Sequence, residues 1–177
     1  MTVSTAASLH EVAQELLDAA ERIIATTSGG PILFACLSPG LPALDRGCDQ
    51  IAVWATALGD EQMSPLTPIP QVGQRRRIGW LNLAGLSVLV ARCLTVQKIP
   101  VPDATLTLDA EKVMEDGWAL WNGVSSAIRS DGIFVGEDPL FGGTCTDIKF
   151  VSMTPLTPEG GMGGWVLSLS VEIAGYR

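Results

Sequence analysis

Apolar side chains recur at three- and four-residue spacing near the N-terminus, which predicts an amphipathic helix beginning at Leu9. Ser8 and Glu11 form a capping-box pair, in which each side chain satisfies the other's free backbone N–H. The helix is expected to stop at Gly29-Gly30-Pro31, because these residues break the helical pattern. One face should be buried, and its apolar positions are Leu9, Val12, Leu16, Ala20 and Ile23.

The middle of the chain predicts two strands. Residues between this helix and Cys48 are rich in proline and glycine and are expected to be an irregular connection. β-prone residues then fill Cys48–Leu58 and a longer run from Arg75 to about Lys98, separated by a proline-containing extended loop near 59–75. A strand of some twenty residues would span about 65 Å. Either Ala84-Gly85 marks a bulge that divides the run, or part of it forms an arm.

The second half predicts a helix and a hairpin. The helix runs from about Asp109 to Arg129, capped by Thr107 or Asp109, and is followed by a short edge strand at 133–135. Trp118 and Trp121 lie three residues apart on it, so at least one should pack on the sheet. Four charged residues are expected to face away from the core: Glu111, Lys112, Glu115 and Asp116. The chain closes with strands at 147–153 and 165–174 around a flexible tip near 154–164.

Together these elements predict a single α+β domain over residues 1–177. Their order is α-β-β-α-β-β, which gives a mostly antiparallel β-sheet packed by two α-helices. The loop near 59–75 and the hairpin arm extend from that body. A chain of 177 residues can bury a core without help from disulfides or metals.

The composition favours a protein that assembles. Only 17% of residues are charged, against roughly 25% in soluble domains, while 47% are hydrophobic. Part of the surface is therefore expected to be covered by other subunits. The net charge of −8 opposes nucleic-acid binding, which needs clustered cations. No signal peptide and no membrane span are expected, since the longest uncharged run, 23–44, is interrupted by glycines and prolines.

Residues with catalytic or ligand-binding potential are scarce. The single histidine, His10, lacks a nucleophile context, and the four cysteines lack zinc-ligand spacing and are expected to be reduced thiols: Cys36, Cys48, Cys93 and Cys145. The glycine-rich stretches do not fit a phosphate-binding loop. We therefore predict no catalytic, metal or cofactor site, and no cofactor.

The candidate functional residues instead belong to a subunit interface. They are a basic cluster with a nearby tryptophan and the glycine-rich hairpin tip: Arg75, Arg76, Arg77, Trp80, Gly160, Gly161, Met162, Gly163 and Gly164. The arginines could pair with acidic side chains of another subunit or form a solvated strand end. The tip could be mobile or become ordered on a neighbour.

Four segments carry a resemblance to a known family: CDQIAVWATAL, RRRIGWLNLAGLSVLVARC, DAEKVMEDGWALWNGV and TPEGGMGGWVLSLSVEI. With the helix-first layout and the proline-rich loop, the chain resembles tail-terminator (head-to-tail connector) proteins of long-tailed phages that infect actinobacteria, from about Ser8 to Ile173. The resemblance implies a structural virion protein, not an enzyme, that assembles in the host cytoplasm. It further implies a hexameric ring that caps the tail tube protein, stops tube polymerisation and docks a head-completion (stopper) protein, with DNA passing through the lumen without specific binding.

Three alternative functions remain besides that of a tail terminator. A head-completion stopper or a tube-like minor tail protein would share the virion context but occupy another position. A small cytoplasmic α/β enzyme or ligand-binding protein would need converging polar groups in a pocket. A nucleic-acid-binding module acting through Arg75–Arg77 would show strongly salt-dependent affinity for DNA.

Overall fold

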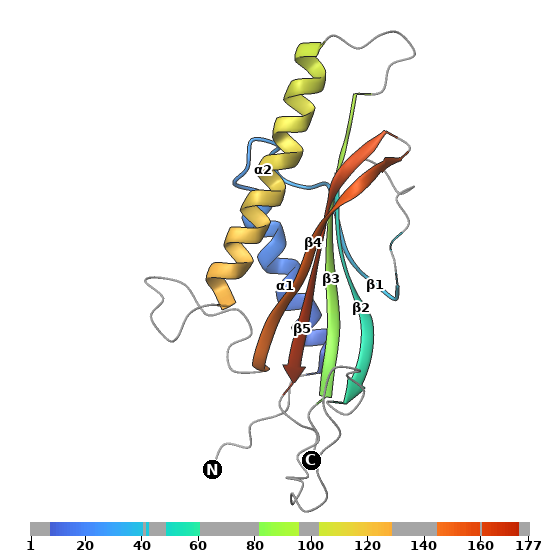
Figure 1. Ribbon diagram of the computed structural model, residues 1–177, viewed down its shortest axis with the longest axis vertical. Coiled ribbons are helices and arrows are strands. Elements are labelled where there is room, and N and C mark those ends of the chain that lie inside the picture. Colours follow the sequence, from blue (N-terminus) through green and yellow to red (C-terminus); the bar gives the residue numbers. More distant parts are fainter. Residues whose placement is uncertain are drawn as a thin grey trace, which may run out of the picture.

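The computed structural model of the chain describes residues 8–40, 42, 49–60, 82–95, 103–128, 145–159 and 161–173. In chain order its elements are α1 (Leu9–Ile24), β1 (Phe34–Ser38), β2 (Gln50–Asp60), β3 (Asn82–Cys93), α2 (Asp103–Ile128), β4 (Cys145–Glu159) and β5 (Met162–Ile173). The strands form a sheet of order β1-β2-β3-β5-β4, and both helices pack against one face of it (Figure 1). The predicted α+β class is confirmed.

Helix α1 begins as the sequence predicts. The Glu11 N–H donates to Ser8 Oγ at 3.2 Å, and the Ser8 N–H donates to Glu11 Oε2 at 2.6 Å, so the capping box is complete. The bond from the Ser8 N–H, followed by the Ser8 side chain, lowers the pKa of the Glu11 carboxyl, because hydrogen bonds to the carboxylate favour its charged form. The buried face follows the predicted periodicity and comprises Val12, Ala13, Leu16, Leu17, Ala19, Ala20 and Ile24.

The sheet is mostly antiparallel, as expected, with one parallel pair. Strands β2–β3, β3–β5 and β5–β4 pair antiparallel, whereas β1 pairs parallel to β2. The sequence did not predict β1, so the order α-β-β-α-β-β lacks one strand. β1 has only five residues between Pro31 and Pro39, and its first three side chains are exposed, so it shows no alternation of buried and exposed positions. Its pairing with β2, rather than its own sequence pattern, makes it a strand.

The bulge expected near Ala84-Gly85 lies on the neighbouring strand. β3 runs unbroken through Gly85, while the register of β2 shifts between Ala55 and Ala57, next to it. A Cβ at Gly85 would stand 2.5 Å from Thr56 Oγ1, so the missing side chain makes room for the bulge. Gly59 and Asp60 belong to β2 and not to the predicted loop; positions 61–81 and 96–102 lie outside the described residues.

The C-terminal hairpin is longer and its turn shorter than predicted. Residues 154–159 continue β4 and 162–164 begin β5, so the expected flexible tip is wrong for these positions. The prolines of β4 are tolerated because β4 is an edge strand, where a missing N–H need not break a ladder. Gly161 turns the chain at φ 80°. The short edge strand expected at 133–135 lies outside the described residues.

Helix α2 starts at Asp103, six residues before the predicted start. Asp109 is therefore not a cap; its Oδ2 accepts a 2.7 Å hydrogen bond from the Thr95 N–H, which lowers the pKa of this carboxyl. Glu111, Lys112 and Glu115 are exposed as expected, whereas the prediction for Asp116 is wrong, since it is 1% exposed.

Asp116 is buried because it meets an arginine there. Arg92 of β3 is 4% exposed, and its Nε donates to Asp116 Oδ2 at 2.7 Å. Arg92 also donates to the Gly30 carbonyl at 2.7 Å, and Thr27 Oγ1 donates to Asp116 Oδ1 at 2.5 Å. This polar cluster thus joins β3, α2 and the end of α1.

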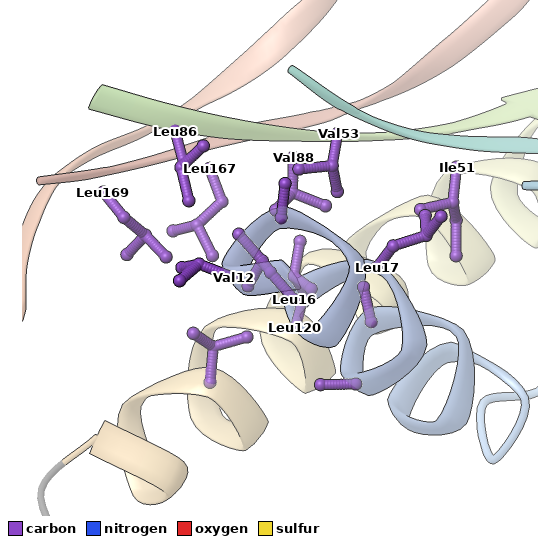
Figure 2. Packing of buried hydrophobic residues seen from close by; sticks show 14 of the residues in the cluster. Val12, Leu16, Leu17, Ile51, Val53, Leu86, Val88, Leu120, Leu167 and Leu169 are labelled. Atoms are coloured by element: carbon purple, nitrogen blue, oxygen red, sulfur yellow. The ribbon is translucent and has the colours of Figure 1, made fainter. Parts of the chain in front are cut away.

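The main core lies between the helices and the sheet. Val12 and Leu16 of α1 point toward the sheet residues Val88 and Leu167, and Leu120 of α2 closes the layer from the other helix (Figure 2). A smaller cluster occupies the opposite face of the sheet near the hairpin turn and comprises Ala52, Trp54, Leu89, Ala91 and Met162.

The described cysteines correct one expectation. Cys36 is a free, exposed thiol on β1, whereas Cys93 is disulfide-bonded, so the prediction of four reduced thiols is wrong. None of the helices in the described part of the chain has the length and apolar character needed to cross a membrane.

Candidate subunit interface

The structure places part of the predicted interface inside the subunit. Met162 is 5% exposed, and Gly163 and Gly164 pair with Arg92 and Ala91 of β3. A Cβ at Gly164 would lie 1.9 Å from the Val90 carbonyl oxygen, so this glycine allows the two strands to approach. These residues stabilise the subunit's own sheet, and their contact with a neighbour stays a prediction. The other candidates, Arg75, Arg76, Arg77, Trp80 and Gly160, lie outside the described residues.

Large apolar side chains are exposed along α2 instead. Trp118 is 69% exposed and Met114 is 58% exposed, one helical turn apart. Leu106 and Leu108 nearer the start of α2 are also about half exposed. The prediction that Trp118 or Trp121 packs on the sheet is confirmed by Trp121, whose ring centroid lies 4.7 Å from that of Phe150. Trp118 is left facing outward.

A pocket of about 350 Å³ opens beside Trp118, between α2 and the β4–β5 hairpin. We call it the α2 groove, and it is lined by Met114, Gly117, Trp118, Trp121, Met153 and Trp165. Every lining side chain is apolar or aromatic, so the groove can bury hydrophobic surface.

The wall formed by Trp165 is fixed by α2 itself. The Trp165 Nε1–H donates to the Val113 carbonyl at 2.8 Å. The indole lies against Gly117, where an added Cβ would stand 2.5 Å from Trp165 Nε1. Because its one polar atom is bonded to the helix backbone, the Trp165 ring presents only carbon to the groove.

Charged side chains also lie on the exposed surface of α2. Glu111 precedes Met114 by three residues and Glu115 precedes Trp118 by three, which places each carboxylate on a neighbouring turn. Glu115 Oε2 also accepts hydrogen bonds from the N–H and the hydroxyl of Ser28. Lys112 is exposed on the same helix. The Glu115 carboxylate is therefore held toward Ser28, which follows α1, whereas the groove lies between α2 and the β4–β5 hairpin.

Three more large apolar side chains in the described part of the chain are exposed at the edges of the sheet. Leu33, just before β1, is 72% exposed, Phe34 at the start of β1 is 51% exposed, and Val151 on β4 is 65% exposed. β1 and β4 are at opposite edges of the sheet, and none of these three residues lines the groove.

His10 is exposed in the first turn of α1. Within the described ranges, no three or more His, Cys, Asp or Glu side chains gather as a metal ion would require.

Sequence reasoning missed the α2 groove as a site. Its signal was the spacing of Met114, Trp118 and Trp121, which puts a second apolar stripe beside the buried one. The groove's other wall comes from the hairpin, through Met153 and Trp165, and only the fold brings these to α2. No protein-family model matches the chain, and no curated protein matches it either.

Proposed function

We propose that this protein is a structural subunit of a phage tail that acts as a tail terminator: it forms a ring that caps the tail tube and joins the tail to the head. The observation that carries the proposal is the exposure of Trp118 and Met114 beside the apolar α2 groove. Large aromatic anchors next to a pocket are typical of protein interfaces. The segments that resemble tail terminators supply the identity of the assembly.

The size of the exposed surface supports assembly. A tryptophan contributes 150–250 Å², so Trp118 at 69% leaves about 140 Å² in solvent. Met114, one turn away and 58% exposed, brings the apolar area on this side of α2 to about 250 Å². Each partner in a standard interface buries about 800 Å², so these two side chains supply about a third of one such contact.

Each face of the ring has its own structural role. One face binds the tail tube protein and ends its polymerisation, and the other binds the head-completion protein. The net charge of −8 per subunit makes the ring acidic, so DNA crosses its lumen without specific binding. No catalytic step and no cofactor are part of this function.

The test is the oligomeric state of the purified chain. Native mass spectrometry over rising protein concentration, with negative-stain images, is expected to show a single closed ring of six copies. Added to polymerising tail tube protein, the ring should shorten the tubes. Open tubes of this chain alone would favour a tube-like tail protein, and a monomer at high concentration would overturn the proposal.

A matched pair of variants tests the role of the groove. Trp118→Ala removes the exposed anchor, and Val151→Ala removes an equally exposed apolar side chain outside the groove. We expect about a 30-fold higher concentration for half-assembly with Trp118→Ala and little change with Val151→Ala. Equal effects of the two substitutions would show that the groove is not the contact between subunits.

A further inference from the structure

We propose that strand β1 pairs with β1 of a second copy of this chain, antiparallel and across a two-fold axis at Cys36. Among the described strands β1 lies at the edge of the sheet and pairs with β2 on its inner side (Figure 1). Met153 and Trp165, which line the α2 groove, lie on β4 and β5, toward the other edge. The contact therefore leaves the groove free. It goes beyond the proposed ring, because it joins two free subunits or subunits of two rings.

The outer edge of β1 exposes the main-chain groups of alternate residues. The Phe34 N–H donates to the Asp49 carbonyl at 3.2 Å, so Phe34 directs its main-chain groups toward β2. In a parallel pair, residues that bond to the neighbouring strand alternate with residues that face away from it. Ala35 and Leu37 therefore direct their N–H and C=O groups outward. Each copy offers two donors and two acceptors along this edge.

A register centred on Cys36 satisfies all of these groups. Two copies of a strand related by a perpendicular two-fold axis run antiparallel, and a two-fold contact uses the same surface on both copies. Ala35 of one copy then lies opposite Leu37 of the other. Opposed residues of an antiparallel pair that exchange both main-chain bonds form a hydrogen-bonded pair, so the two Ala35–Leu37 pairs make four hydrogen bonds.

Neighbouring registers satisfy fewer groups. Centred on Ala35, the pairing would place Leu37 opposite Leu33, whose N–H already donates to the Asp49 carbonyl. Centred on Leu37, it would place Ala35 opposite Pro39, which has no N–H. The hydrogen-bonding pattern of this edge therefore selects the register that has Cys36 on the axis.

The side chains around β1 favour contact between copies. Positions 31–40 contain no aspartate, glutamate, lysine, arginine or histidine, so two copies meet there without charge repulsion. Leu33 and Phe34 are 72% and 51% exposed. In the register centred on Cys36, Phe34 lies opposite Ser38 of the second copy. Pairing therefore removes part of this exposed apolar surface from water.

The other edge of the sheet carries features that prevent such pairing. β4 contains Pro155 and Pro158, which have no N–H to donate, and Lys149 on this strand is exposed. Its register with β5 also shifts at three places. Prolines, lysines and bulges are the usual features that keep an edge strand from pairing with another chain. β1 has no proline, no lysine and no register shift within Phe34–Ser38, so it is the edge through which the sheet extends.

The free, exposed thiol of Cys36 reports the contact. In this register the two Cys36 residues form a non-hydrogen-bonded pair with Cα atoms about 4.5 Å apart, a distance that a disulfide can bridge. Added oxidised glutathione would link them: the two thiols lose two protons and two electrons and form one S–S bond, and the glutathione disulfide is reduced to two thiols. We expect covalent pairs joined at Cys36, identified by peptide mass spectrometry, and none from Cys36→Ser. Absence of the Cys36–Cys36 peptide at high protein concentration would overturn the proposal.

Relocated cysteines test the register. In the Cys36→Ser chain, Phe34→Cys together with Ser38→Cys should restore covalent pairs, because these two positions oppose each other across the axis. Phe34→Cys without the second change should link copies about 10-fold more slowly or less, since two Phe34 positions lie four residues apart along the paired strands, about 13 Å. Equal rates for the two chains would indicate random collisions and would overturn the proposal.

A proline substitution tests the main-chain hydrogen bonds. Ala35→Pro removes one outward N–H from each copy, which deletes two of the four bonds between copies and none of the bonds to β2. We expect linkage through Cys36 to become about 10-fold slower or more. Val151→Ala, at the other edge of the sheet, is the control and should change the rate less than about 2-fold. An unchanged rate with Ala35→Pro would overturn the proposal.

Native mass spectrometry of the same samples separates this inference from the proposed function. Rings that form without linkage through Cys36 would refute only the pairing of β1. Pairs linked through Cys36 in a chain that forms no ring would refute only the proposed function.

Discussion

The buried contact between Arg92 and Asp116 allows the sharpest test of the fold. The Arg92 side chain donates to both Asp116 oxygens, at 2.7 and 3.4 Å, and to the Gly30 carbonyl. Asp49 lies at the margin of the cluster, with its Oδ2 3.9 Å from an Arg92 nitrogen. Replacing Asp116 with alanine would leave the Arg92 charge buried without its main partner.

The expected loss of stability is large for a domain of this size. Removing one partner of a buried ion pair costs about 3–5 kcal/mol, because the remaining charge is desolvated and uncompensated. Arg92 and Asp116 are 4% and 1% exposed, so solvent screens the pair little. The hydroxyl of Thr27 also loses its carboxylate acceptor. Since the free energy of unfolding of a domain is about 5–15 kcal/mol, Asp116→Ala should approach the limit of folding.

Urea denaturation monitored by tryptophan fluorescence measures this loss. Glu111→Ala, an exposed acid on the same helix, is the control and should stay within about 0.5 kcal/mol of wild type. The double variant Arg92→Met with Asp116→Leu should be less destabilised than the two single changes summed, because it leaves no buried charge unpaired. An Asp116→Ala protein within about 1 kcal/mol of wild type would refute the reasoning.

Three further changes test single contacts. Gly164→Ala should destabilise the β3–β5 pairing by several kcal/mol, since the new Cβ would meet the Val90 carbonyl; faster amide exchange along β3 would report it. Ser8→Ala removes the N-cap and should cost about 1 kcal/mol in a urea titration. In an NMR titration the Asp109 carboxyl should show a pKa below its usual value, because the Thr95 N–H stabilises its charged form. This contribution to stability is present near neutral pH and is lost as the pH falls through the lowered pKa. Asp109→Asn should abolish this part of the pH dependence of stability.

Local patterns in the sequence were enough for much of the fold. The spacing of Leu9, Val12 and Leu16 predicted the buried face of α1, and Ser8 with Glu11 predicted its start. Runs of β-prone residues predicted most of β2 and β3, and alternation of apolar residues predicted most of β5. These elements were predictable because their hydrophobic period matches the geometry of the backbone that forms them.

Other features arise from contacts between distant segments, and the local sequence carries no sign of them. β1 became a strand by pairing with β2, although Pro31 and Pro39 bound it and its side chains do not alternate. Asp116 follows Glu115 in an acidic run typical of an exposed helix, yet Arg92, 24 residues away, makes its burial possible. A charged side chain is buried only where the folded protein places a compensating partner beside it. The local sequence around Asp116 does not show that this partner is Arg92.

Some features of the candidate interface follow from the sequence, and others depend on the tertiary structure. The sequence by itself determined that this protein has few charges, many apolar residues, a basic cluster at 75–77 and a helix with two tryptophans. Only the tertiary structure decided that Trp121 turns inward to Phe150 while Trp118 stays outside, beside a groove completed by Met153 and Trp165. Exposure depends on what the rest of the chain covers, and hydrophobic periodicity within one helix does not contain that information.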